Sequence, residues 1–360
     1  LLPDHQVTAV LTSGDCGLLV AVAPRATASS LVLIDPDGTQ HALTHESGWT
    51  AGTYRSGTLL TVRSTIDTCD WTRELWRWNP GDEGPQHLST IESYAMSPPL
   101  EVQPHLLTVG ERNLNVAVLW PSGHELGSVK LPVIMNPYGG PHAQRVYEVG
   151  RAYSEAQWIA DQGFAVIIAD GRGSPGRGPA WERTINGDLA TFPLQDQIDA
   201  LHGVARRWPA DIDLDRVGIT GWSFGGYLAA LAVLRRPDVF HAAVAGAPVT
   251  EWRLYDSAYT ERYLGDPIRT AENYDASSLL PLAPNLERPL MIIHGFADDN
   301  VLVAHSVQLS AALTAAGRPH TFLPLANVTH MTPQEEVAEN LLKLEVEFFT
   351  RNLLGKQQDQ

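Results

Sequence analysis

The feature that most constrains this chain is a serine flanked by glycines, at the junction of an apolar strand and an apolar helix. Residues 221–226 read Gly-Trp-Ser-Phe-Gly-Gly, after the strand-like run 216–220 and before the helical run 227–234. Glycines two positions before and after the serine let the backbone turn sharply around it. Such a turn is typical of a nucleophile elbow, which lifts the serine hydroxyl above the edge of a sheet. The pattern therefore predicts Ser223 as a nucleophile.

Strands and helices alternate along the chain from about residue 116 onward. This alternation predicts a mostly parallel sheet with helices on both faces, so we expect an α/β-hydrolase catalytic domain over residues 116–360. The expected strands are 132–136, 164–170, 216–220, 241–246, 289–294 and 320–324. The expected helices are 151–162, 193–208, 224–236, 303–316 and 333–353.

Residues 1–115 contain short apolar runs separated by turns, without a helical period. We expect strands at 18–22, 30–34, 59–62 and 74–78, with a turn at Asp35-Pro-Asp-Gly38. Roughly 110 residues hold about two propeller blades, and a propeller needs about four to close. We therefore expect an all-β segment that forms the C-terminal part of a truncated β-propeller, with Leu1 at a trimmed N-terminus. A small complete β domain is the alternative.

A serine nucleophile needs a base and an acid, which in this fold follow the serine in chain order. His330 lies just beyond the last expected strand, where the base belongs, whereas His294 and His320 are less well placed. Asp298 and Asp299 follow the strand 289–294, and either can supply the acid that orients the imidazole. Spacing alone leaves the choice between these two aspartates open.

The transition state also needs hydrogen-bond donors for the developing oxyanion. The backbone N–H of Phe224 is one donor, because it directly follows the serine. The second donor is expected in the loop 136–141, which reads Asn-Pro-Tyr-Gly-Gly-Pro. The phenol of Tyr138 and the backbone N–H groups of the glycines are both candidates.

Four ordered motifs resemble the prolyl oligopeptidase family of serine peptidases, and within it the dipeptidyl peptidase IV branch. They are the segments 170–174 (Asp-Gly-Arg-Gly-Ser), 221–227, 255–263 (Tyr-Asp-Ser-Ala-Tyr-Thr-Glu-Arg-Tyr) and 294–301 (His-Gly-Phe-Ala-Asp-Asp-Asn-Val). The resemblance implies that Asp298 is the acid and that the Tyr138 hydroxyl is the second oxyanion donor. It also implies an N-terminal β-propeller and cleavage after Pro or Ala in short peptides.

The same resemblance implies a substrate pocket that accepts a proline ring. Its lining would consist of Val249, Trp252, Tyr255, Tyr259 and Val301, with Asn300 contacting the substrate backbone. Aromatic side chains pack well on a flat pyrrolidine ring, which agrees with this assignment.

The chain departs from the family pattern at three places. Phe224 stands where the family usually has tyrosine, and His330 lies in the context Asn-Val-Thr-His-Met instead of acid–His–Gly. The branch holds a free substrate amino terminus with a glutamate pair in the propeller, and residues 1–115 contain no matching pair. Glu335 and Glu336 lie at the start of an expected helix, where carboxylates match the helix dipole.

The composition limits which partners the chain can bind. The formal net charge of -16 argues against nucleic acid and anionic membranes as partners. We expect a short peptide substrate, no cofactor, no metal ion and a cytoplasmic location. A homodimer through the hydrolase domain is a further hypothesis. The alternative functions are a carboxylesterase or acylaminoacyl-peptidase on the same fold, and a binding protein without catalysis.

Overall fold

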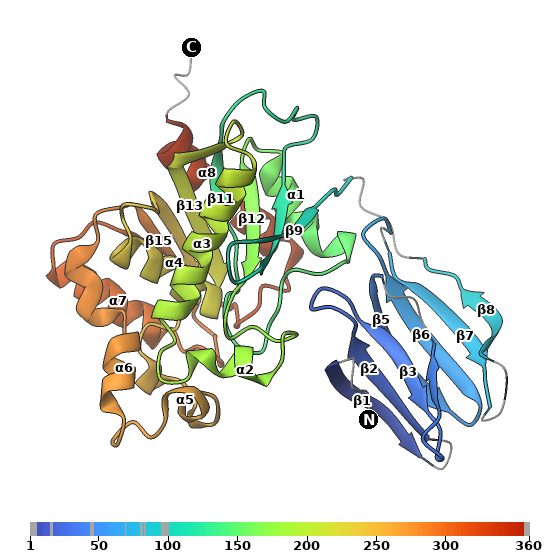
Figure 1. Ribbon diagram of the computed structural model, residues 1–360. Coiled ribbons are helices and arrows are strands. Elements are labelled where there is room, and N and C mark those ends of the chain that lie inside the picture. Colours follow the sequence, from blue (N-terminus) through green and yellow to red (C-terminus); the bar gives the residue numbers. More distant parts are fainter. Residues whose placement is uncertain are drawn as a thin grey trace. The chain divides into compact units, whose positions relative to one another are not determined.

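The computed structural model describes residues 6–14, 17–43, 47–68, 70–79, 82, 84–94 and 101–355. These residues form two compact units (Figure 1). The first unit contains the residues up to 106 together with 146–158 and 175–178. The second unit contains 107–145, 159–174 and the residues from 179 onward. Within the described part of the chain, no helix is long and apolar enough to cross a membrane.

The first unit is built on two antiparallel sheets of four strands each, in the orders β1-β2-β3-β4 and β5-β6-β7-β8. The strands are β1 (Gln6–Gly14), β2 (Gly17–Ala23), β3 (Ser30–Ile34), β4 (Gln40–Ala42), β5 (Trp49–Arg55), β6 (Thr58–Ser64), β7 (Thr72–Arg77) and β8 (Gln86–Ile91). The four expected strands correspond to β2, β3, β6 and β7, and β1, β4, β5 and β8 extend their sheets. The expected turn before β4 also forms, because the Gly38 N–H donates to the Asp35 carbonyl at 2.9 Å.

Large apolar side chains from both sheets form the core of this unit. Leu31 on β3, Tyr54 on β5 and Trp78 after β7 belong to one buried cluster. A Cβ atom on Gly52 of β5 would lie 2.9 Å from the Leu31 side chain, so the two sheets approach closely. A parallel bridge between Ser29 and Trp49 also connects them. The all-β character expected for this part of the chain is confirmed.

The second unit is built on a sheet of eight strands, in the order β16-β15-β14-β13-β11-β12-β10-β9. Its strands are β9 (His105–Val109), β10 (Leu114–Leu119), β11 (Leu131–Met135), β12 (Ala165–Asp170), β13 (Ile212–Trp222), β14 (Ala242–Gly246), β15 (Leu290–Gly295) and β16 (Thr321–Leu325). The strands from β11 to β16 are parallel, whereas β10 pairs with β12 in the antiparallel sense. The parallel strands are the six expected from the sequence. Their carboxyl ends meet at one edge of the sheet, where ligands bind in such folds.

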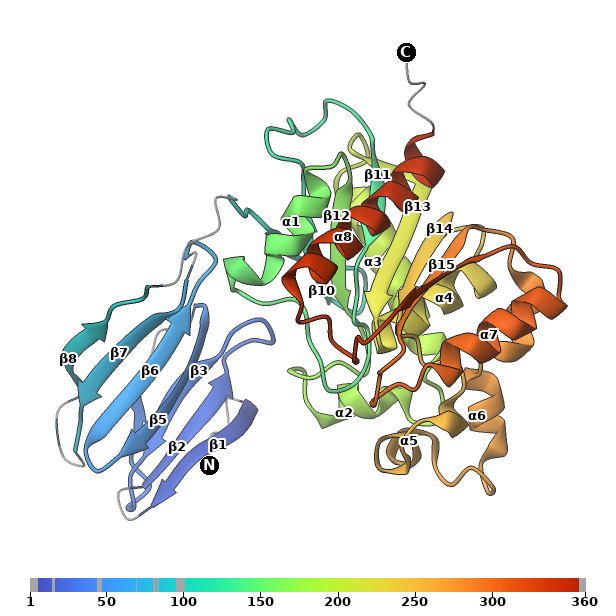
Figure 2. The ribbon, with the colours of Figure 1, turned by 180° about the vertical axis from the view of Figure 1, so that it is seen from behind.

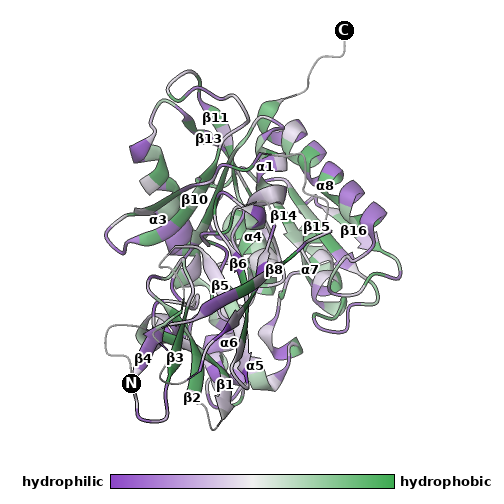
Figure 3. Cartoon of the chain, turned by 90° about the vertical axis from the view of Figure 1, so that its right-hand side faces the viewer, coloured by the Kyte–Doolittle hydropathy of each residue, from purple (hydrophilic) through white to green (hydrophobic). Residues whose placement is uncertain are grey.

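Helices cover both faces of this sheet. Helices α3 (Thr191–Arg207) and α4 (Phe224–Arg235) lie on one face, and α8 (Glu335–Phe349) lies on the other (Figures 1 and 2). The remaining helices are α1 (Ser154–Ala160), α2 (Pro179–Glu182), α5 (Ser257–Leu264), α6 (Ala271–Ser277) and α7 (Ala304–Ala315). The middle strands are green in Figure 3, whereas α8 carries both green and purple stretches, as expected for a helix with one face on the sheet. The expected α/β-hydrolase fold class is confirmed.

Candidate active site

Ser223 lies in a strained turn between β13 and α4. Its φ of +59° falls in the left-handed region, which a non-glycine residue adopts only when its surroundings hold it there. The Ser223 N–H donates to the Gly246 carbonyl at 2.9 Å. A Cβ atom on Gly221 would lie 2.5 Å from the backbone of Gly225, and one on Gly226 would lie 2.2 Å from the Gly246 oxygen. These positions therefore require glycine, and the turn has the geometry of a nucleophile elbow.

His330 and Asp298 meet beyond the carboxyl ends of β16 and β15. His330 Nδ1 lies 2.8 Å from Asp298 Oδ2, and the other carboxylate oxygen accepts the N–H groups of Asn300 at 3.0 Å and Val301 at 2.9 Å. Burial raises the pKa of Asp298, but hydrogen bonds from His294 and His330 outweigh it and hold the pKa well below its ordinary value. The carboxylate is therefore charged, whereas the neighbouring Asp299 is exposed.

A second imidazole also contacts the Asp298 carboxylate. His294 is fully buried, and its Nε2 lies 2.7 Å from the Val301 carbonyl and 3.3 Å from Asp298 Oδ2. A carbonyl oxygen only accepts, so Nε2 carries a proton, and Nδ1 lies 2.6 Å from the Ser306 hydroxyl. His294 thus orients the carboxylate. The sequence places His294 at a strand end but gives no sign of this contact.

Trp222, the residue before the serine, connects the elbow to the histidine loop. Its indole Nε1 donates to the His330 carbonyl at 2.7 Å. A Cβ atom on Gly246 would lie 2.0 Å from the Trp222 ring, so glycine at this position gives the indole its space. The bond fixes the His330 backbone next to the turn that carries Ser223.

The loop that carries Tyr138 packs directly on the elbow. A Cβ atom on Gly140 would lie 2.4 Å from the Phe224 ring, and one on Gly225 would lie 2.5 Å from the Pro137 oxygen. Burial and nearby phenols raise the pKa of Tyr138 to about 12. The Tyr138 hydroxyl therefore keeps its proton at neutral pH and can donate it in a hydrogen bond. The loop of Tyr138 thus packs against Phe224, and these two residues carry the two candidate oxyanion donors.

The base of the Tyr138 loop is fixed by a carboxylate at the end of β12. Asp170 accepts the backbone N–H of Arg145 at 2.9 Å, and the Arg145 guanidinium donates to the Asn136 side-chain oxygen at 2.6 Å. Asn136 and Arg145 stand at the two ends of the loop, so these bonds close it. Asp170 is the first residue of the Asp-Gly-Arg-Gly-Ser motif, and it has a structural role here.

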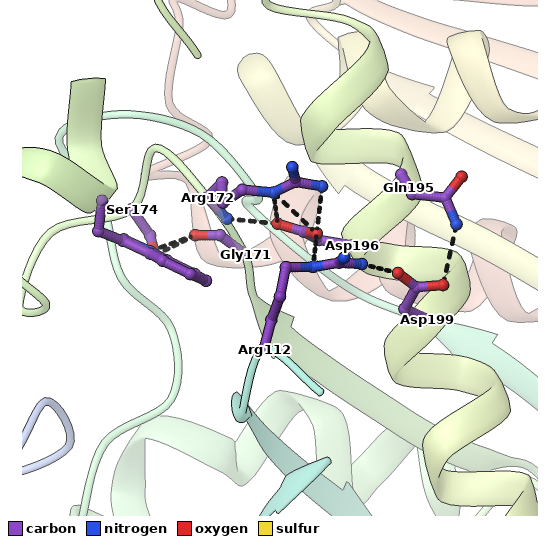
Figure 4. Close-up of polar contacts among 8 residues, drawn as sticks. Arg112, Gly171, Arg172, Ser174, Gln195, Asp196 and Asp199 are labelled. Atoms are coloured by element: carbon purple, nitrogen blue, oxygen red, sulfur yellow. Dashed lines mark hydrogen bonds and ion pairs between the residues drawn. The ribbon is translucent and has the colours of Figure 1, made fainter. Parts of the chain in front are cut away.

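The third residue of that motif belongs to a buried charge cluster on α3 (Figure 4). The Arg172 guanidinium binds the carboxylate of Asp196 with two donors, at 2.7 Å and 2.9 Å, and the Arg172 backbone N–H donates to it at 2.6 Å. Arg112 adds a fourth donor at 3.0 Å. Asp196 is fully buried, whereas Asp199, which pairs with Arg112, is partly exposed. The cluster fastens the segment after β12 to α3.

The aromatic side chains expected to line the pocket pack against one another. Trp252 and Tyr259 are stacked with ring centroids 6.0 Å apart and an interplanar angle of 7°. Tyr255 stands edge-on to Tyr259 at 5.4 Å, and its hydroxyl donates to the Asn300 side-chain oxygen at 2.7 Å. The Asn300 amide therefore has its N–H groups left to donate to a ligand. Phe224 also contacts Trp252, which joins these rings to the elbow.

The other two expected pocket residues are buried beside these elements. Val249 follows β14 and Val301 follows the Asp298 turn, and they are 2% and 0% exposed. No group of three or more His, Cys, Asp or Glu side chains in the described ranges could hold a metal ion. The described residues thus bring together an elbow serine, an aspartate–histidine pair and packed aromatic rings, without a metal-binding cluster among them.

The fold and the elbow define an α/β-hydrolase with a serine at the nucleophile position. Residues 151–356 match the sequence profile of the prolyl oligopeptidase family, which is more than half of the chain. The chain therefore belongs to this family of serine peptidases.

Curated relatives and solved structures agree with this membership. The chain is 40% identical to human (Homo sapiens) dipeptidyl peptidase 8 over 196 residues, and 37% identical to pig (Sus scrofa) dipeptidyl peptidase 4 over 193 residues. Each match covers 53% of this chain but only 22% and 25% of those proteins, respectively. The crystal structure of Porphyromonas gingivalis dipeptidyl peptidase 4 superposes with a TM-score of 0.87 and 26% identity, over 97% of this chain and 50% of that one. The chain thus spans about a quarter of the length of these curated relatives and half of the solved structure.

Proposed function

We propose that this protein is a serine peptidase that hydrolyses short peptides after Pro or Ala, in the manner of a dipeptidyl peptidase. One observation supports the proposal most: Asp298 bonds to His330, and the His330 carbonyl accepts the indole N–H of Trp222, the residue before Ser223 in the elbow. The names of the relatives support the substrate class.

In the proposed reaction, the Nδ1 of His330 is engaged by Asp298, so Nε2 takes the Ser223 proton. The serine oxygen then attacks the substrate carbonyl, and the new oxyanion is stabilised by the Tyr138 hydroxyl and the Phe224 backbone N–H. The C–N bond breaks as His330 Nε2 returns the proton to the leaving amine. Water, deprotonated by the same nitrogen, then releases the acyl group and restores the serine.

The pocket residues account for the proposed specificity. The partly exposed rings of Tyr255 and Tyr259 would offer flat apolar surface to a proline ring, with the buried Trp252 stacked behind Tyr259. Val249 and Val301 are buried and would support this surface from behind, and the Asn300 amide would donate to a carbonyl of the substrate backbone. A side chain larger than proline or alanine is expected to fit poorly.

We also propose that the strands β1 to β8, within residues 1–115, form part of a β-propeller and that residues 116–360 form the catalytic domain, whose sheet also includes β9 and the start of β10. Two four-stranded antiparallel sheets that share a core support this reading, because a propeller blade is a sheet of four strands. In such an enzyme the propeller would restrict the size of the substrate.

The test compares three substrates with the full chain: Ala-Pro-p-nitroanilide, its N-acetylated form and p-nitrophenyl acetate. We expect hydrolysis of the free-amino amide, and loss of it in Ser223→Ala. Preference for the acetylated amide would instead favour an acylaminoacyl-peptidase. Ester hydrolysis without amide cleavage would favour a carboxylesterase and refute the proposal.

A further inference from the structure

The Tyr138 loop carries a histidine in an unusual backbone conformation at its tip. His142 has a φ of +70°, in the left-handed region, which a non-glycine residue adopts at an energetic cost. Its side chain is exposed. Such a conformation persists only where other contacts hold it, so the contacts of His142 are informative.

Among the described residues, the hydrogen bond and the ring contacts of the His142 side chain are made with helix α5. His142 Nε2 lies 2.9 Å from the Tyr263 hydroxyl, and the imidazole packs against Tyr259 with ring centroids 5.3 Å apart. The Tyr263 ring stands edge-on to the imidazole at 5.9 Å. The tip of the loop is therefore bonded to one pocket-side helix through one hydrogen bond and two ring contacts.

Helix α5 is itself a fixed support. The Asp256 carboxylate caps it by accepting the Tyr259 N–H at 2.9 Å, and the Tyr263 carbonyl accepts the Gly187 N–H at 2.8 Å. Tyr259 is also stacked on the buried Trp252. A bond from His142 to this helix thus holds the loop tip against a rigid element.

The loop that carries Tyr138 is held at its base, on the side of the elbow and at its tip. The bond between Asp170 and Arg145 closes the base of the loop. Gly140 packs so closely on the Phe224 ring that the loop cannot move nearer to the elbow. The tip, four residues after Tyr138, is held through His142. Tyr263 also lies close enough to Tyr138 to contribute to the raised pKa of its phenol.

We propose that His142 is a positioning residue, which bonds the loop tip to Tyr263 and thereby holds the Tyr138 hydroxyl at the oxyanion site. This inference rests on the proposed role of Tyr138 as an oxyanion donor. His142 acts through Tyr138 and does not itself touch the substrate. An oxyanion donor misplaced by a fraction of an ångström stabilises the transition state less, while ground-state binding changes little.

The experiment is a double-mutant cycle. His142→Leu removes the imidazole, and Tyr263→Phe removes only the hydroxyl partner while keeping the ring. Each is expected to lower kcat for Ala-Pro-p-nitroanilide about 5-fold to 10-fold, the effect of one lost hydrogen bond, with KM within about 2-fold. His142→Gln, which keeps a polar group at this site, should recover part of the loss.

In the Tyr138→Phe background the same changes are expected to lower kcat by less than about 2-fold, because the hydroxyl that they position is gone. The second-order rate of phosphonylation of Ser223 by a fluorophosphonate reports on the same oxyanion site without amide cleavage. This rate can be measured in every variant of the cycle even if the protein does not cleave the amide. A failure of the proposed function can therefore be told apart from a failure of this inference. Single variants with unchanged rates, or losses that add fully to that of Tyr138→Phe, would overturn the role of His142. If His142→Leu does not fold, Tyr263→Phe gives the same test.

Discussion

At the scale of single residues, the site depends on a carboxylate held between two imidazoles. Asp298 lies 2.8 Å from His330 and 3.3 Å from His294, and these bonds lower its pKa against the opposing effect of burial. A carboxylate with a depressed pKa stabilises the fold at pH values above its unfolded pKa, and this contribution is lost as the pH falls through the folded pKa. The charge is therefore fully present at neutral pH, where it would stabilise the imidazolium of the proposed reaction.

We expect Asp298→Asn to lower kcat by about 10³-fold to 10⁴-fold, because an amide cannot stabilise the imidazolium or select the correct tautomer. Asp299→Asn is the matched control, since this neighbour is exposed, and it should change kcat by less than about 3-fold. Steady-state kinetics of both variants provide the measurement. Equal losses in the two variants would show that the acid is wrongly assigned.

The raised pKa of Tyr138 predicts how kcat changes with pH in alkaline solution. Its pKa is raised to about 12, so the neutral, donating form persists well above the pH at which an ordinary tyrosine ionises. We expect kcat to stay level from about pH 8 to about pH 10, because no donor is lost in that interval. Tyr138→Phe should lower kcat by about 10²-fold to 10³-fold across the same interval. A fall of wild-type kcat between these pH values that is absent in Tyr138→Phe would contradict this.

At the scale of elements, close backbone approach sets the distance between the Tyr138 loop and the elbow. Gly140→Ala places a Cβ atom 2.4 Å from the Phe224 ring, so the loop or the ring must move. We expect kcat to fall by about 10-fold or more, since small displacements at a site are costly. Phe224→Ala removes the ring but keeps the backbone N–H, and in combination with Gly140→Ala it should recover part of the rate. No recovery would mean that another contact limits the loop.

Substitutions in the charge cluster on α3 are expected to change the free energy of unfolding and leave the catalytic residues in place. Asp196→Asn leaves Arg172 and Arg112 without their buried carboxylate, which is expected to cost about 3–5 kcal/mol of unfolding free energy. Asp199→Asn removes only a partly exposed partner of Arg112 and should cost about 0–1 kcal/mol. Chemical denaturation measures both. Similar midpoints for the two variants would argue against the structural role of Asp196.

Several elements of the second unit could be predicted from the sequence because their signals are local. The apolar runs of β12 and β15 and the glycines of the elbow determine their own conformation, and the order of strand ends places Asp298 and His330 together. The sequence did not predict the antiparallel strand β10, nor the helices α5 and α6, whose 8 and 7 residues are too few to show an apolar period. The contacts of His294 and His142 were also missed, since they join residues that only the folded sheet brings together.

At the scale of the whole molecule, the charge balance bears on substrate capture. The formal net charge of -16 creates a negative field that attracts a cationic peptide with a free amino group. We expect kcat/KM for Ala-Pro-p-nitroanilide to fall by about 2-fold or more between about 20 mM and about 500 mM salt, because the Debye length shortens. The N-acetylated amide is neutral and should show no such dependence. The same salt dependence for both amides would exclude electrostatic steering.

The central claim is that Ser223 is the nucleophile of a charged Ser–His–Asp arrangement. The most direct measurement is covalent labelling by a fluorophosphonate, followed by tandem mass spectrometry of the labelled peptide. We predict one adduct on Ser223, no labelling in Ser223→Ala, and labelling slowed by about 10³-fold or more in His330→Ala. An adduct at another residue, or amide hydrolysis that persists in Ser223→Ala, would contradict the account.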